Sequence, residues 1–205
     1  MSQQEDARNH VLRASIDTAI ARLTNSYDAG GKLLICGNGG SAADCEHIVG
    51  ELMKGFCLPR SLSSADRNQL TKTCGDDAKF LGEKLQYGLP ALSLVSHSSL
   101  ITAIANDIDG DMIFAQQVWG IGKAGDVLLT ISTSGNSQNV LLAAKVARAK
   151  EITVIGLTGR SGGQLALLCD VLINVQSNNV ATVQELHLPI YHEICRSIEA
   201  HYFTK

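Results

Sequence analysis

The sequence predicts an α/β protein with a mostly parallel sheet that helices cover on both faces. Three observations support this class. Short apolar runs alternate with helix-like stretches, which is the pattern of βαβ units. A length of 205 residues suits a single domain, 1–205, with a substantial core. A hydrophobic content of 45%, with 19 glycines and only 3 prolines, is typical of a globular chain.

The expected strands are the five short apolar runs of the chain, at 32–36, 90–95, 126–131, 152–157 and 170–175. Helix-like stretches lie between and after them, at 41–54, 98–105, 111–120, 137–149, 162–168 and 181–203. An N-terminal helix is predicted over 8–27, because its apolar residues share one helical stripe and the run AGGK then ends the pattern. We therefore expect five parallel strands flanked by helices, with an additional helix at the start.

Residues 58–89 break this rhythm. They are polar and turn-rich, and they are much longer than the roughly 2–6 residues of an ordinary connection in such a fold. A short helix is expected around 76–86. The segment is interpreted as a surface excursion or an oligomer contact.

Charge and cysteine content exclude several classes of protein. The net charge is −3 and the charges are dispersed, so no basic stripe indicates nucleic acid and no lysine-rich amphipathic segment indicates a membrane surface. No apolar run approaches the roughly 18–20 residues of a membrane span, and the polar start MSQQEDARNH is unlike a signal or transit peptide. The six cysteines form no CxxC pair, which favours reduced thiols and a cytoplasmic protein.

Two predicted strands end in turns with unusual chemistry, and parallel strands collect ligands at this edge of the sheet. The first turn is CGNGGS, residues 36–41, where glycines permit positive φ and Ser41 could cap the next helix. An ordinary tight turn explains it as well as an anion site does. It lacks the GxGxxG spacing of a dinucleotide fold.

The second turn is STSGNS, residues 132–137, which brings four hydroxyls to a strand-to-helix junction. Hydroxyl groups and backbone amides at the start of a helix suit a phosphate monoester. A purely structural turn rarely needs so many hydroxyls. Neither turn carries the lysine of a P-loop, which argues against nucleoside triphosphate hydrolysis.

Behind the first turn, His47 and Glu51 lie four residues apart and therefore on one helix face. Taken alone, this pair is explained better by a solvated polar face or by a hydrogen bond between residues i and i+4. The last helix adds Gln184, Glu185, His187 and His192 among apolar residues. Spacing alone does not select among these four.

Four motifs together resemble the sugar isomerase (SIS) superfamily: GNGGSAAD with H-x3-E behind it, ISTSGNS, ITVIGLTG-x-x-GG, and VQELH-x4-H. Within it the chain is most similar to the phosphoheptose isomerase family of heptose synthesis. The resemblance implies a five-stranded, flavodoxin-like three-layer sandwich. It also implies a homotetramer with active sites between subunits.

The resemblance further implies a set of site residues. The positions matching His47, Glu51, Gln184 and His192 surround a zinc ion in the family, and these residue types are acceptable zinc ligands. Substrate contacts are implied at the positions of both turns and at two further residues: Asn38, Gly39, Ser41, Ser132, Thr133, Ser134, Ser137, Asp107 and Gln184.

The implied reaction converts sedoheptulose 7-phosphate to glycero-manno-heptose 7-phosphate through an enediol. Glu51 is the expected base at C1 and C2, and His192 the acid/base at the oxygens. A carboxylate bound to zinc is a weaker base, so its roles as ligand and as base compete.

The chain departs from the family just before Gln184, where Ala181 and Thr182 replace an Asp-Arg pair. A related phosphosugar is therefore an alternative substrate. Non-catalytic SIS proteins that bind phosphosugars or a replication initiator are a second alternative. The initiator-binding type lacks residues matching Glu51 and His192, and both are present here. An etherase of N-acetylmuramic acid 6-phosphate is a weaker alternative, since its chain would be longer.

Overall fold

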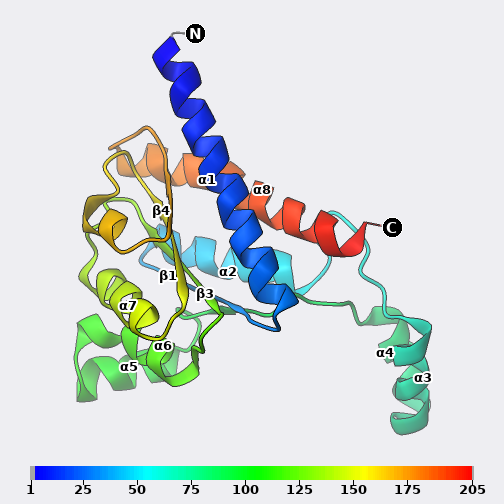
Figure 1. Ribbon diagram of the computed structural model, residues 1–205. Coiled ribbons are helices and arrows are strands. Elements are labelled where there is room, and N and C mark those ends of the chain that lie inside the picture. Colours follow the sequence, from blue (N-terminus) through cyan, green and yellow to red (C-terminus); the bar gives the residue numbers. More distant parts are fainter. Residues whose placement is uncertain (1–2, 205) are drawn as a thin grey trace.

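The computed structural model describes residues 3–204, with side chains from residue 8 onward. Its centre is a five-stranded parallel sheet in the order β2-β1-β3-β4-β5 (Figure 1). The strands are β1 (Leu33–Gly37), β2 (Ala91–Ser93), β3 (Val127–Ser132), β4 (Thr153–Thr158) and β5 (Val171–Asn174). The predicted strands are confirmed, each beginning one residue later than expected. This strand order is that of flavodoxin-like folds.

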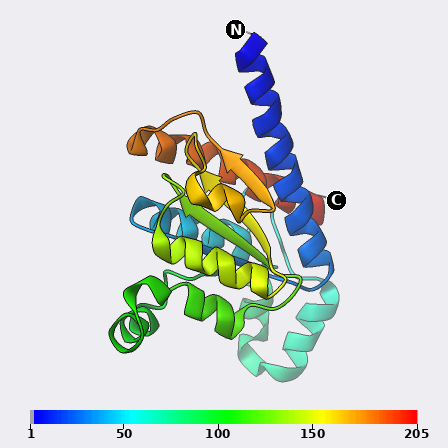
Figure 2. The ribbon, with the colours of Figure 1, turned by 60° about the vertical axis from the view of Figure 1, so that its left-hand side comes forward.

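Helices cover both faces of the sheet. On one face lie α1 (Gln3–Asp28), α2 (Gly40–Met53) and α8 (Val180–Phe203), and on the other α6 (Ala115–Ile121) and α7 (Gln138–Ala149) (Figures 1 and 2). Alternate strand residues explain this, because Leu33 and Ile35 pack with the first group and Leu34 and Cys36 with the second. The three-layer prediction is confirmed.

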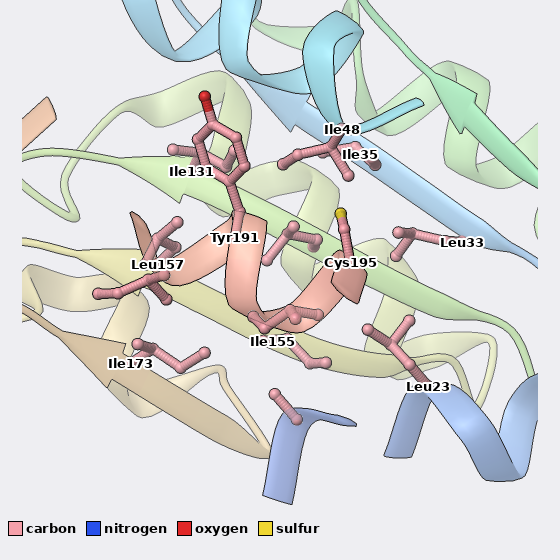
Figure 3. Close-up of a cluster of buried hydrophobic side chains, with 14 of the residues drawn as sticks. Leu23, Leu33, Ile35, Ile48, Ile131, Ile155, Leu157, Ile173, Tyr191 and Cys195 are labelled. Carbon is pink, nitrogen blue, oxygen red and sulfur yellow. The ribbon is translucent and has the colours of Figure 1, made fainter. Parts of the chain in front are cut away.

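The first of these two cores holds the functional helices together (Figure 3). Tyr191 and Cys195 of α8 reach into it beside Ile48 of α2 and Leu23 of α1. Each of these four side chains is almost wholly buried. The relative position of α2 and α8 is therefore set by a shared apolar core.

The remaining helices differ in detail from the prediction. The stretch 98–105 forms α5 (Ser98–Asp107), whereas 111–120 splits into the 3-10 turn η2 (Gly110–Met112) and α6. The stretch 162–168 is a 3-10 helix, η3 (Gly163–Leu167). No helix among the described residues is long and apolar enough to cross a membrane.

Residues 58–89 contain two helices rather than the single one expected around 76–86. They are α3 (Ser64–Thr73) and α4 (Ala78–Lys84), joined by the 3-10 turn η1 (Gly75–Asp77), and they project from the body (Figure 1). Ser63 caps α3 by accepting a hydrogen bond from the Asp66 amide at 3.1 Å. No α3 residue is buried, so the helix has no apolar stripe to reveal it.

Candidate active site

The two predicted turns meet where the strand order reverses. The chain leaves β1 for β2 on one side and returns to β3 on the other, and ligands collect at this position in open α/β sheets. Asn38 follows β1, and Asn139 lies in the first turn of α7, which follows β3. Their side-chain amides exchange two hydrogen bonds, each of 2.9 Å. The two turns therefore form one continuous rim.

The first turn places glycine where the backbone requires it. Gly39 has φ +58° and stands directly before α2. A Cβ on Gly40 would lie 2.5 Å from Nε2 of Gln184, so the Gln184 side chain lies against this turn. The sequence suggested that Ser41 caps the helix, but in the structure it does not. It lies inside the first turn of α2 and is buried, because Gly39 already occupies the capping position.

In the second turn the hydroxyls hydrogen-bond with the turn itself. Oγ of the buried Ser132 accepts from the Gly135 amide at 3.1 Å and lies 3.2 Å from Oγ of Ser137. Ser134 is exposed and accepts from the Asn136 amide at 3.2 Å, and Thr133 is half-buried beside it. Ser137 directly precedes α7, so the hydroxyls surround the start of a helix of 12 residues.

A third loop, which follows β4 and was not among the predicted site residues, packs against the second turn. A Cβ on Gly135 would lie 1.9 Å from the carbonyl oxygen of Gly162. The Leu165 amide donates to the Gly135 carbonyl at 3.0 Å, and the Gln164 amide donates to Oδ1 of Asn136 at 3.0 Å. The paired glycines of ITVIGLTG-x-x-GG were visible in the sequence, but their contact with Gly135 of the second turn was not.

Farther along α2, three predicted site residues come together. Nε2 of His47 lies 3.2 Å from Oε1 of Glu51 and 3.5 Å from Nε2 of His192. Glu51 also has the Lys54 ammonium 3.6 Å away. Since α2 and α8 pack against each other, residues 145 positions apart share one site within a single chain. Burial, with His47 and Arg196, lowers the pKa of His192, and Glu51 opposes this shift.

Two residues that sequence reasoning missed lie behind His47. The Tyr191 hydroxyl lies 3.0 Å from Nδ1 of His47 and donates to Oδ1 of Asp44 at 3.1 Å. Burial raises the pKa of Asp44, while Tyr191 and His47 oppose this shift. Asp44 lies three residues before His47 and hence on the same helix face, a signal that the sequence did contain. Nothing in the sequence indicated Tyr191.

Two predicted residues lie apart from this trio. Among the described residues, no hydrogen bond joins Gln184 to His47, Glu51 or His192. Asp107 is exposed at the end of α5, where its Oδ1 accepts from Asn106 at 2.8 Å. Their expected roles stay predictions.

The donor types of the trio suit zinc. Its two contacts, 3.2 and 3.5 Å, are close to the roughly 3.3 Å between two ligands of a tetrahedral zinc ion. Within residues 3–204, however, no group of three or more His, Cys, Asp or Glu side chains has the spacing to hold a metal ion. The residues therefore fit zinc by donor type and by two distances, but their positions do not form a complete ligand set.

A buried ion pair fixes the end of α2 against α8. The Arg60 Nε donates to Oε1 of Glu199 at 2.9 Å, and both side chains are fully buried. The same guanidinium donates to the Glu51 carbonyl at 3.0 Å, and Glu199 accepts from the amides of Phe56 and Cys57. Burial opposes ionisation of Glu199, but these hydrogen bonds and Arg60 hold its pKa below the usual value.

The trio is partly open to solvent in the single chain, with Glu51 more buried than His47. The His47 side chain is 41% exposed. A hollow of 520 Å³ lies elsewhere, between residues 59–64 and the end of α8. A substrate would therefore stay exposed to water at this surface unless another chain covered it.

Comparisons with known proteins place the chain in a family. The SIS domain family matches residues 5–66 and 81–159. The phosphoheptose isomerase of Nitratidesulfovibrio vulgaris is 41% identical over 167 residues, which cover 82% of this chain and 68% of that protein. That of Rhodospirillum rubrum is 39% identical, over 90% of this chain and 85% of the relative.

A solved structure agrees as well. The phosphoheptose isomerase of Neisseria gonorrhoeae is 33% identical, with a TM-score of 0.73 over 97% of this chain and all of that one. The family match includes both turns and α2 but ends before α8, whereas the structural likeness covers 97% of the chain. The chain therefore belongs to the SIS domain family and, within it, to the phosphoheptose isomerases.

Proposed function

We propose that this chain is an aldose-ketose isomerase that converts sedoheptulose 7-phosphate to glycero-manno-heptose 7-phosphate. The observation that carries the proposal is the meeting of Glu51 and His192 at His47, on two helices far apart in the sequence. The kinship with phosphoheptose isomerases supports the choice of substrate.

A carboxylate and an imidazole supply the proton transfers that this reaction needs. Glu51 removes a proton from C1 of the ketose and returns it to C2, with an enediol between the two steps. His192 moves a proton from O1 to O2, so atoms and charge balance. Its lowered pKa keeps the imidazole neutral near pH 7, able to accept one proton and release another.

The hydroxyl-rich second turn is the proposed phosphate site. Ser134, Thr133 and Ser137 offer donors at the start of α7, and the buried Ser132 fixes the shape of the turn. Asn38, Gly39 and Ser41 border the sugar from the first turn. Asp107 and Gln184 are assigned to the sugar hydroxyls.

Zinc is the proposed cofactor, held by His47, Glu51, Gln184 and His192. When bound, it would polarise the ketose carbonyl and so favour loss of the C1 proton. Gln184 lies against Gly40, so its oxygen would have to turn toward the imidazoles.

A homotetramer with active sites between subunits is also part of the proposal. The exposure of His47 supports it, because proton transfer to carbon is faster where water is excluded. The compartment that we propose is the cytoplasm.

A related phosphosugar is the second candidate substrate. Ala181 and Thr182 occupy the first turn of α8, just before Gln184, and neither side chain carries a charge. A substrate that needs no acidic partner there would fit this surface.

Proton NMR of the purified, zinc-loaded protein tests the function directly. Sedoheptulose 7-phosphate should yield an aldose 7-phosphate, whereas five- and six-carbon ketose phosphates should react more slowly. Faster reaction of a shorter sugar would reassign the substrate. Tight binding without turnover of any of these sugars would overturn the enzyme proposal in favour of a phosphosugar-binding protein.

A further inference from the structure

The Tyr191 hydroxyl links the two helices of the site at a position behind His47. It lies 3.1 Å from Oδ1 of Asp44 and 3.0 Å from Nδ1 of His47. Its ring is packed in the apolar core, and only the hydroxyl stands at the edge of that core (Figure 3). Tyr191 is 1% exposed, so water does not compete for these two contacts.

The hydrogen of this hydroxyl can go to one partner only. A carboxylate accepts and cannot donate, so a bond between Tyr191 and Asp44 takes the tyrosine hydrogen. The hydroxyl oxygen then faces Nδ1 of His47 with a lone pair, and this contact forms only if Nδ1 carries a hydrogen. In a neutral imidazole Nε2 is then bare.

The opposite arrangement is less favourable. If Tyr191 donated to His47, the half-buried Asp44 would lose the one side-chain hydrogen bond that the described residues give it. Glu51, which would gain the Nε2 hydrogen, already has Lys54 as a second partner at 3.6 Å. The need for a hydrogen is therefore greater at Asp44 than at Glu51.

We propose that Asp44 and Tyr191 are positioning residues that hold His47 as the Nδ1–H tautomer, with the Nε2 lone pair directed at Glu51 and His192. Nε2 of His47 and the Glu51 carboxylate then face each other as electron-pair donors without a hydrogen between them. This is the state that a divalent cation requires of its ligands. The inference deepens the proposed function, because it rests on zinc as the ion.

Replacing Tyr191 by Phe tests this, because the ring stays in the core and only the hydroxyl is lost. In metal-free protein with ¹⁵N-labelled histidine, long-range NMR correlations should assign the His47 hydrogen to Nδ1 in the wild type. In Tyr191→Phe they should show a shift toward Nε2–H. Zinc affinity, measured by competition with a chromophoric chelator, should fall roughly 10- to 100-fold in the variant.

Tyr27→Phe is the matched control. Tyr27 also has a buried hydroxyl, without any hydrogen-bond partner among the described residues, and it packs on Tyr202 rather than near the trio. Its removal should leave both the tautomer and the zinc affinity at wild-type values.

Two results would overturn the inference: a wild-type His47 that carries its hydrogen on Nε2, or unchanged zinc affinity in Tyr191→Phe. A wild type that takes up no zinc would instead refute the cofactor part of the proposed function. The tautomer of the metal-free protein would still decide the inference in that case.

Discussion

His187 on α8 is fully buried, and neither of its ring nitrogens has a hydrogen-bond partner among the described residues. Burial lowers its pKa below the ordinary value of 6.5, and the nearby Thr158 backbone only partly offsets this. At a pH between the pKa of folded His187 and that of unfolded His187, the unfolded chain binds a proton that the folded chain does not bind. Stability therefore rises with pH across that interval and falls as the pH drops below 6.5.

His187→Leu should remove this pH dependence, because leucine fills the site and binds no proton. Urea unfolding between about pH 5 and 7 measures it as the slope of unfolding free energy against pH. The wild-type slope should exceed that of the variant. Equal slopes would show that the pKa of His187 is the same in the folded and the unfolded chain.

Gly135→Ala should damage the second turn. Its φ of +66° would alone cost about 1–2 kcal/mol in a residue with a Cβ. The new atom would also meet the Gly162 carbonyl at 1.9 Å, so we expect about 2–4 kcal/mol in urea unfolding. Gly125→Ala is the control, since Gly125 has φ +87° with nothing within 4 Å. A similar loss of unfolding free energy in both variants would show that the contact with Gly162 does not matter.

At this scale the sequence indicated the residue types of the site better than their contacts. The hydroxyls of the second turn and the His47–Glu51 pair follow from local spacing, whereas His192 was selected by family resemblance. The capping role of Ser41 was wrong, because a positive φ at Gly39 is invisible in a list of residues. Tyr191 was missed because its partners lie more than 140 positions away.

At the scale of elements, the Arg60–Glu199 pair and the shared apolar core hold α2 against α8. The guanidinium binds the Glu51 backbone directly, so Arg60 helps to position Glu51, the proposed catalytic carboxylate. Its cation also stacks on the Phe203 ring near the end of α8, 4.7 Å from the ring centre.

Glu199→Gln should therefore be costly, because it leaves the Arg60 charge buried and unpaired. We expect a loss of about 3–5 kcal/mol in denaturant unfolding. Glu193→Gln, on the same helix, removes a carboxylate that pairs with Arg13 at the surface, and it should change stability little. A Glu199→Gln variant as stable as the wild type would show that the pair does not fix the helices.

Local sequence patterns revealed most elements, because each strand is a short apolar run and each core-facing helix has regularly spaced apolar residues. Helix α3 was missed because none of its residues is buried, so only its cap marks it. The stretch 111–120 divided because Asp109 caps a separate 3-10 turn, accepting from the Asp111 amide at 2.7 Å.

For the whole molecule, local sequence patterns predicted the layers, whereas the flavodoxin-like strand order was implied only by the family resemblance. That order depends on which strand edges pair, and no local pattern encodes it. It is nevertheless what brings the turns after β1 and β3 together. The projecting pair α3–α4 exposes Phe80 by 62% and Leu85 by 46%, which supports its interpretation as an oligomer contact.

Phe80→Glu should weaken the proposed tetramer, because it places a charge in an apolar contact. Light scattering coupled to size exclusion should show a smaller assembly, with the secondary structure unchanged by circular dichroism. Phe80→Leu should keep the wild-type mass. A Glu variant that assembles like the wild type would place the contact elsewhere on the chain.

Glu51 is the proposed base that moves the substrate proton, and isomerisation in D₂O by Glu51→Gln is the decisive experiment for this role. The wild type should form the aldose phosphate from sedoheptulose 7-phosphate. Glu51→Gln should be slower by about 10²–10⁴-fold. Glu46→Gln, on the exposed side of the same helix, should react at the wild-type rate and incorporate the same deuterium at C2. A Glu51→Gln variant that is folded and reacts as fast as the wild type would rule out Glu51 as the base.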